Sequence, residues 1–314
     1  MIKFKGRRWL SIVSIIMSVV MLSTCMMTGC TEEEANEFFN SIFGEGSYET
    51  SGELTGDAHL KMHVIDVGQG DSILIQCGDK NVLIDCGENG MGETVLDYLD
   101  RAGVTHLDWL VATHPHSDHI GGMDTVLNSD ITVDNMMMSR TSKSMTPTTK
   151  TYKDLLSAIE NKGLKAIQPV PGETYDLDGV TMLVLSPKKN SDYDDLNDYS
   201  VVLKFIYKDV SIFTGGDATK KVEKELLKTD YDLSADIYKV SHHGGKESSY
   251  DEFVKAVNAK YSAISAGKDN QYGHPKQETL DRLNEINSQI NRTDLDGSII
   301  YETDGTNIAV TTSK

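Results

Sequence analysis

The chain has 314 residues, enough for one large domain or two small ones with a substantial core. Its 30 Lys and Arg against 48 Asp and Glu give a formal net charge of −18, which repels nucleic acid at long range. A phosphate-bearing substrate would therefore need metal ions or a local basic patch to bind. Four cysteines without a CxxC pair exclude a cysteine-rich zinc site.

The N-terminus has the layout of a secretory signal. A basic start precedes an apolar run from Trp9 through Leu22, and Met27-Thr28-Gly29-Cys30 follows. The small residues before Cys30 resemble a bacterial lipobox, in which the cysteine is lipidated and becomes the new N-terminus. An uncleaved membrane helix is the alternative. We expect a signal peptide over residues 1–29 and a protein held on the extracytoplasmic face of the membrane by a lipid on Cys30.

The next segment, residues 30–58, is acidic. Positions 31–58 hold eight acids, no Lys or Arg, and several glycines. This composition predicts a flexible tether, with a short helical turn around Phe38-Phe39 as the alternative. The folded domain is expected over residues 59–314.

Strand-like and helix-like patterns alternate through this domain. In chain order we expect strands over 60–66, 72–76 and 81–85, a helix over 93–101, a strand over 107–112, a helix over 151–161, strands over 180–185, 200–207 and 210–213, a helix over 218–227, a strand over 236–240, a helix over 250–257, a strand over 261–266, a helix over 277–286, and a closing hairpin over 298–302 and 307–311. This mixture predicts a single layered α+β domain, in which helices cover sheets.

Three imidazoles and a carboxylate fall within six positions directly after the expected strand 107–112: His114, His116, Asp118 and His119. In extended chain His114 and His116 project to one side, while Asp118 and His119 lie at the turn into a helix. The spacing predicts two ions side by side, one on each pair. These donors suit Zn²⁺ first, and also Mn²⁺ or Fe. A His-rich solvated loop is the alternative. It is disfavoured because the whole chain has only nine histidines, and three of them within six positions are improbable by chance.

Candidate metal ligands or substrate contacts also occur at three further places, each of which follows a strand or precedes a helix. Asp217 either bridges the two ions or caps the following helix, and the histidine cluster favours the bridge. His242 and His243 are adjacent and are expected to point in different directions, so we assign His242 to the metal and His243 to the substrate. His274 precedes Pro275 at an expected helix start, where it could hold an anionic group. A plain surface role is the alternative for His274.

Five motifs together resemble the metallo-β-lactamase superfamily: DVGQGDS at 66–72, LIDCG at 83–87, THPHSDHIGG at 113–122, SHHGG at 241–245 and YGHP at 272–275. The HxHxDH pattern is specific to the superfamily, and the other motifs narrow the resemblance to its ComEC-like branch, over roughly residues 60–310. The resemblance implies a four-layer αββα sandwich with metals at one edge and nuclease-like cleavage of DNA. Related exported esterases act on phosphorylcholine of cell-wall polymers, so the substrate does not follow from the fold.

The chain departs from the family pattern at one ligand. Many members supply another histidine before the bridging Asp, but none stands between His119 and His242 here. Asn197 and Ser200 occupy this stretch, as in ComEC-like domains, and both are also candidate substrate-binding residues. We therefore expect an under-coordinated ion at His114 and His116, helped by Asn197 or water, and unequal affinities at the two sites.

The expected mechanism uses a hydroxide held between two ions, because metals lower the pKa of water to about 7 and polarise a phosphoryl oxygen. Asp118 would ligate one ion or orient the hydroxide. His243 or His274 would steady the phosphoryl oxygens, with Lys246 and Ser248 as further candidates. An exported phosphodiesterase or nuclease is the leading hypothesis. The alternatives are a hydrolase of a cell-envelope ester, such as a phosphorylcholine ester, or of a lactam, and a non-enzymatic surface binding protein, which the intact ligand set disfavours.

Overall fold

The structure is a computed structural model that describes residues 32–44 and 48–313. The expected signal peptide and Cys30 lie outside these residues. Within the described ranges, no helix has the length and apolar character needed to cross a membrane.

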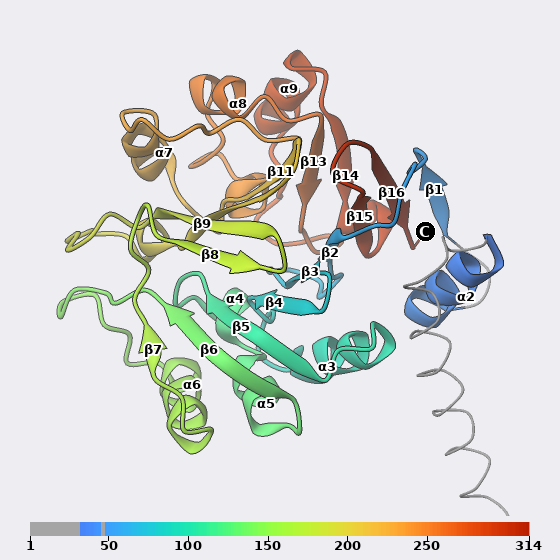
Figure 1. The fold of residues 1–314 in the computed structure, drawn as a ribbon. Coiled ribbons are helices and arrows are strands. Elements are labelled where there is room, and N and C mark those ends of the chain that lie inside the picture. Colours follow the sequence, from blue (N-terminus) through green and yellow to red (C-terminus); the bar gives the residue numbers. More distant parts are fainter. Residues whose placement is uncertain (1–31, 45–47, 314) are drawn as a thin grey trace, which may run out of the picture.

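Two sheets pack face to face (Figure 1). The first has the order β1-β16-β15-β2-β3-β4-β5-β6-β7 and the second β14-β13-β12-β11-β10-β9-β8. The strands of the first sheet are β1 (Glu49–Ser51), β2 (Leu60–Val64), β3 (Ile73–Cys77), β4 (Lys80–Ile84), β5 (His106–Ala112), β6 (Thr132–Met138), β7 (Ala166–Ile167), β15 (Ile299–Thr303) and β16 (Ile308–Thr312). Those of the second are β8 (Thr174–Leu177), β9 (Val180–Ser186), β10 (Val202–Tyr207), β11 (Val210–Thr214), β12 (Ile237–Lys239), β13 (Tyr261–Ile264) and β14 (Gln289–Arg292).

Helices cover the outer face of each sheet (Figure 1). The first sheet carries α2 (Glu32–Phe43), α3 (Gly92–Arg101), α4 (Ser117–Ile120), α5 (Met123–Asn128) and α6 (Lys150–Asn161). The second carries α7 (Lys220–Leu226), α8 (Asp251–Val257) and α9 (Gln277–Glu285), and short turns form η1 (Leu196–Tyr199), η2 (Ser241–Gly244) and α10 (Thr293–Asp296). This arrangement confirms the predicted α+β class and its four αββα layers.

Alternation along the strands divides the core into three apolar clusters. In β3, Ile73 and Ile75 face the cluster between the sheets, whereas Leu74 faces the helices over the first sheet. A third cluster lies between the second sheet and its helices. Successive strand side chains point to opposite faces, so a sheet buried on both sides needs apolar residues at nearly every position.

The polar motifs all follow strand ends at one edge of the sandwich. β4, β5 and β6 run parallel in the first sheet, and β11, β12 and β13 run parallel in the second. The segments after β5, β11 and β12 carry the residues predicted to hold metal. Carboxyl ends of parallel strands are where open α/β sheets place their sites.

The expected flexible tether is structured over much of its length. α2 buries Phe39 and Ile42 in the cluster over the first sheet, and β1 pairs with β16. The backbone N–H groups of Thr55 and Gly56 donate to Asp304 Oδ2 at 2.9 and 3.1 Å. The alternative of a helical turn around Phe38-Phe39 fits α2, whose short apolar stripe is hidden by acids when composition is averaged over these 28 residues.

Candidate metal centre

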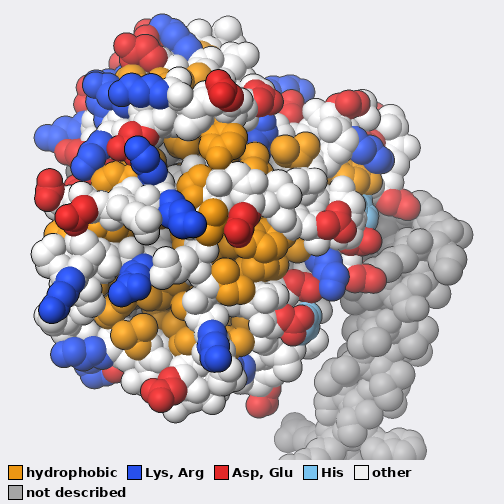
Figure 2. All heavy atoms as spheres, turned by 60° about the vertical axis from the view of Figure 1, so that its left-hand side comes forward, with side chains coloured by type: hydrophobic (Ala, Val, Ile, Leu, Met, Phe, Trp, Pro, Cys, Tyr) orange, Lys and Arg blue, Asp and Glu red, His pale blue; other side chains and the backbone are white. Residues whose placement is uncertain are grey.

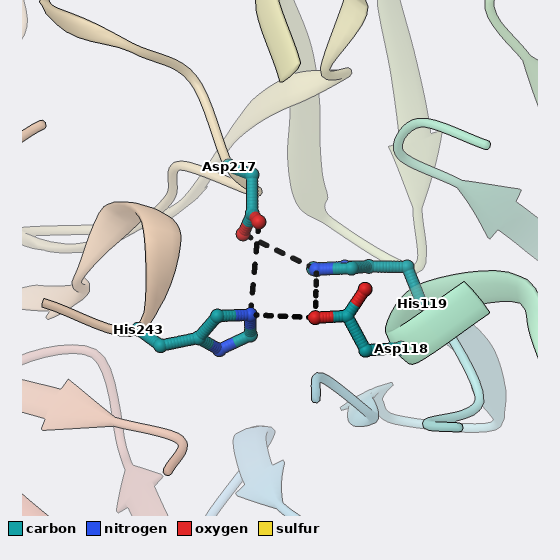
Figure 3. A group of neighbouring side chains, drawn as sticks. All are labelled: Asp118, His119, Asp217 and His243. Atoms are coloured by element: carbon teal, nitrogen blue, oxygen red, sulfur yellow. Dashed lines mark ion pairs between the residues drawn. The ribbon is translucent and has the colours of Figure 1, made fainter. Parts of the chain in front are cut away.

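Four ligand-type side chains meet at this edge (Figure 3). Asp118 and His119 lie in α4 just after β5, Asp217 follows β11, and His243 follows β12. His119 Nε2 is 3.2 Å from Asp217 Oδ1, and His243 Nε2 is 3.4 Å from Asp118 Oδ2 and 3.6 Å from Asp217 Oδ2. Two imidazoles and two carboxylates at this spacing form the donor set that Zn²⁺ or Mn²⁺ takes.

Several atoms in this group are buried without a hydrogen-bond partner. Among the described residues, His119 Nε2, Asp217 Oδ1 and His243 Nε2 are such atoms. A buried polar atom left unpaired costs about 1–3 kcal/mol, and native proteins hold few of them. Three that converge on one point fit a site for a cation, so these residues fit the metal that the resemblance implied.

The remaining predicted ligands surround the same carboxylate. His114 Nε2 and His242 Nε2 each lie 3.8 Å from Asp217 Oδ2, and His116 Nδ1 lies 3.0 Å from His114 Nε2. Asp217 therefore stands between the two histidine groups, where a bridging carboxylate would stand. Figure 3 shows that it enters from the opposite side to Asp118. The choice of ligands for each ion stays a prediction.

His243 joins the four-residue group, although the sequence favoured His242 as the ligand. Both residues have left-handed backbone, with φ of 52° and 53°, so both Nε2 atoms lie within 3.8 Å of Asp217 Oδ2. The expectation that adjacent side chains diverge assumed regular backbone. Non-glycine residues in such conformations cost about 1–3 kcal/mol each. Hydrogen bonds from His242 N to Gly216 O and from Gly245 N to His242 O hold the turn.

A carboxylate that the sequence analysis did not assign orients His119. Asp85 Oδ2 accepts from His119 Nδ1 at 2.7 Å and from Thr113 Oγ1 at 2.6 Å, and its Oδ1 accepts from Thr113 N at 2.9 Å. These bonds leave His119 Nε2 free to face the group. The available signal was an Asp at the end of an apolar strand in LIDCG, because a buried carboxylate must find donors.

Charges within the group shift each other's pKa. Burial opposes the charged form of His243, yet Asp217, Asp118 and Asp71 outweigh burial and raise its pKa to about 10. Burial also opposes charge on Asp217, but His119 and His243 hold its pKa well below its usual range. In the metal-free protein His243 thus carries a proton that a metal ion would displace.

The predicted substrate-binding residues divide into two kinds. Ser200 and Ser248 are buried, and they bond to backbone: Ser200 Oγ accepts from Asp217 N at 3.1 Å, and Ser248 Oγ donates to Ser241 O at 2.9 Å. Asn197 is also buried, and its Oδ1 has no partner among the described residues. Lys246 is exposed beside Glu247, 3.7 Å away.

His274 lies at the margin of the group rather than in a helix. Its ring centroid is 5.7 Å from that of His242 and 6.2 Å from that of His243. α9 begins at Gln277, as expected, which is two residues after Pro275, and Asn270 bonds to both backbone groups of His274. Burial and the two neighbouring histidines lower the pKa of His274 to about 4, which leaves it neutral at pH 7.

Comparisons with known proteins indicate the same superfamily as the motifs that form the metal centre. A family model described as the metallo-beta-lactamase superfamily matches residues 65–268. ComE operon protein 3 of Bacillus subtilis (strain 168) is 31% identical over 259 residues, covering 77% of this chain and 33% of that protein. Competence protein ComA of Neisseria gonorrhoeae is 29% identical over 259 residues, covering 79% and 33%. The chain thus spans about a third of the length of these relatives.

Two solved structures match the chain at low sequence identity, and the first of them shows the same fold. A mutant of the β-hydroxylase CmlA is 10% identical with a TM-score of 0.51, covering 88% of this chain and 60% of that one. The metallo-β-lactamase fold protein YhfI from Bacillus subtilis is 12% identical with a TM-score of 0.47, covering 74% and 96%. From the family match over residues 65–268, the chain belongs to the metallo-β-lactamase superfamily of metal-dependent hydrolases, and it is similar to about a third of the length of ComE operon protein 3 and competence protein ComA.

Proposed function

We propose that this protein is a metal-dependent phosphodiesterase whose substrate is DNA or another polymeric phosphodiester. The observation that carries the proposal is a basic surface on α7, the helix that follows Asp217 along the chain, on an otherwise acidic protein. We call it the α7 lysine surface; it consists of Lys220, Lys221, Lys224 and Lys228.

The α7 lysine surface begins three residues after Asp217. With Glu225 it lines an open hollow of about 420 Å³. Lys221 pairs with Asp198 at 3.6 Å, whereas Lys220, Lys224 and Lys228 have no ion pair with any residue that the structure describes. Figure 2 shows Lys and Arg side chains gathered over the upper left of this face. Unpaired cations attract phosphates, so this surface supplies the basic patch that a chain of net charge −18 needs for a polyanion.

Within the site, the side chains differ in their access to a substrate. When bound, metal ions would supply a water of lowered pKa and would neutralise charge on the phosphoryl oxygens. The Asp118 side chain is 23% exposed, whereas those of His119 and Asp217 are 0% and 3% exposed. Asp118 is therefore the carboxylate placed to take a proton from an attacking water. Neutral His274 at the margin can donate a hydrogen bond to a phosphoryl oxygen.

Activity of the full chain tests the proposal. We expect the Mn²⁺- or Zn²⁺-loaded protein to cleave bis-p-nitrophenyl phosphate and single- or double-stranded DNA, and to lose both activities with EDTA and in His116→Ala. The matched control is His59→Ala, because His59 lies just before β2 and pairs with Asp178, outside every candidate metal group of the described residues. Hydrolysis only of p-nitrophenyl phosphorylcholine or of a lactam, or no hydrolysis by the metal-loaded chain, would contradict it.

We also propose that the protein is exported and lipid-anchored through Cys30. Support comes from the sequence alone, in the basic start, the apolar run and the small residues before the cysteine. Mass spectrometry of membrane-fraction protein should find a mature N-terminus at a lipid-modified Cys30. An unmodified Met1 terminus would contradict this.

A further inference from the structure

A fully buried ion pair lies beneath His243. Lys239 Nζ donates to Asp71 Oδ2 at 2.8 Å, and the two side chains are 0% and 1% exposed. Lys239 ends β12 in the second sheet, and Asp71 closely precedes β3 in the first. The pair thus joins the two sheets at the edge that carries the metal group.

This pair cannot be explained by stability alone. Removing two charges from water costs several kcal/mol per ion, and replacing a buried pair by apolar residues is often neutral or stabilising. Lys239 gains one further hydrogen bond, to Val240 O at 3.1 Å, and Asp71 Oδ1 has no hydrogen-bond partner among the described residues. An imperfectly satisfied buried pair points to a role other than stabilising the fold.

The free oxygen of the pair lies next to His243. Asp71 Oδ1 is 3.4 Å from His243 Nδ1, and the same Nδ1 is 3.1 Å from Ser265 O. A carbonyl oxygen only accepts, so Nδ1 carries the hydrogen and donates it to Ser265 O beside the carboxylate. Nε2 then faces Asp118 and Asp217 at 3.4 and 3.6 Å, with no hydrogen bond of its own among the described residues.

The backbone of Asp71 ties the same unit to the other half of the metal group. Asp71 N donates to Asp118 O at 3.1 Å, and Gly87 N donates to Asp71 O at 2.8 Å. One residue therefore contacts the His243 ring through its side chain and the Asp118 segment through its backbone. A displacement of Asp71 would move both candidate ligands.

We propose that Asp71 and Lys239 are positioning residues that orient His243 toward the metal, with Lys239 holding the Asp71 carboxylate in place. Carboxylates behind a ligating histidine fix its ring and raise its strength as a ligand, and their loss costs about 10–100-fold in metal affinity or activity. The pair serves metal affinity at the expense of stability. The inference rests on the proposed metal centre, but it does not depend on the substrate.

The test measures metal affinity and stability separately in the full chain. The variants are Asp71→Asn, Lys239→Met and the double apolar variant Asp71→Leu/Lys239→Met. Affinity for Zn²⁺ alone is measured by competition with a chelating dye, and thermal unfolding is followed in EDTA. The matched control is Lys204→Met, because Lys204 is another buried lysine of the second sheet and pairs with Asp232 at 3.0 Å, away from the group.

We expect the two properties to separate in the double variant. It should unfold in EDTA at the wild-type temperature or above, yet bind Zn²⁺ about 10–100-fold more weakly. Each single variant should lose both affinity and thermal stability, since it leaves a buried group unpaired. Lys204→Met should lose stability and keep its Zn²⁺ affinity.

Wild-type Zn²⁺ affinity in the double variant would overturn the positioning role, as would an affinity loss that merely follows unfolding. Binding of Co²⁺ provides a second readout, because a displaced His243 changes the visible absorption of the bound ion. A wild-type chain that binds Zn²⁺ but cleaves no phosphodiester would refute the proposed function and leave this inference standing. A wild-type chain that binds no Zn²⁺ would refute both.

Discussion

His119 Nδ1 donates a hydrogen bond to Asp85 Oδ2 at 2.7 Å, and neither side chain is exposed. The bond fixes the hydrogen on Nδ1 and leaves Nε2 to face Asp217. Asp85 itself has left-handed backbone, with φ of 58°, so the strand end is shaped to bring this carboxylate under the histidine.

Replacing Asp85 by Asn should damage both fold and metal binding. Three donors converge on its two oxygens, and an amide NH₂ would face at least one of them. We expect a loss of about 1–3 kcal/mol in the free energy of unfolding and about 10–100-fold in Zn²⁺ affinity. Urea unfolding in EDTA and a chelator competition measure the two effects. In the control Asp232→Asn, which weakens the pair with Lys204 outside every candidate metal group of the described residues, Zn²⁺ affinity should not change.

The two ions should bind with unequal affinity. The group of Asp118, His119, Asp217 and His243 is compact, whereas the His114–His116 pair has only the shared Asp217 and, in the sequence pattern, Asn197 as further side chains. Titration of the apo protein should give two Zn²⁺ or Mn²⁺ equivalents with distinct dissociation constants. His116→Ala should remove the weaker step and keep the stronger one. Two identical steps, or loss of both steps in that variant, would contradict the assignment.

Two glycines of the DVGQGDS motif should respond differently to alanine. Gly70 has φ of +124°, and an added Cβ would lie 2.2 Å from Asp118 O; Gly68 has φ of +72° and open space around it. Gly68→Ala should cost about 1 kcal/mol from backbone strain alone. Gly70→Ala should cost several times more and should weaken metal binding, because Asp118 must move. Equal unfolding free energies in urea for the two variants would show that this close approach is unimportant.

The α7 lysine surface should determine the salt dependence of DNA binding. The triple variant Lys220→Ala/Lys224→Ala/Lys228→Ala removes three unpaired charges. Binding of single-stranded DNA by metal-free protein should weaken. The slope of log K against log salt should become shallower by about 2, because each phosphate neutralised on a single strand adds about 0.7 to that slope. The triple control Lys208→Ala/Lys255→Ala/Lys260→Ala changes the same charge elsewhere on the domain. Equal slopes in the two triple variants would contradict a specific role for α7.

The metal-free protein should lose stability as the pH rises. The folded-state pKa of His243 is about 10, above the unfolded value of about 6.5, so its contribution is complete below pH 6.5 and disappears as the pH rises through 10. Glu223 acts in the same direction, because burial raises its pKa to about 8. Thermal unfolding in EDTA should therefore shift to lower temperature between pH 6.5 and 10. A flat or rising profile would contradict these protonation states.

The edge of the sandwich that carries the metal centre could be predicted from the sequence. Which side chains meet one another at that edge could not. The strands before His114, Asp217 and His242 are apolar and short, so their ends and the polar residues beyond them were recognisable. The left-handed turn at His242 and His243 was not, because no local pattern marks two non-glycine residues in that conformation. Asp71 and Lys239 are 168 positions apart, and only the packing of the two sheets brings them together. The edge strands β1, β7 and β14 are short, and their patterns were too weak to recognise, whereas the apolar stripe of the 12-residue helix α2 lies within an acidic stretch.

The four-residue metal group takes two members from each half of the sandwich. Asp118 and His119 follow a strand of the first sheet, whereas Asp217 and His243 follow strands of the second. An ion bound by these residues would link the two sheets at this edge, next to the apolar cluster that they share. Removal of the metal by a chelator would then loosen this edge before the two sheets separate. Amide hydrogens of residues 113–122 and 241–249 would exchange faster with solvent, while those of β3 and β11 would stay protected.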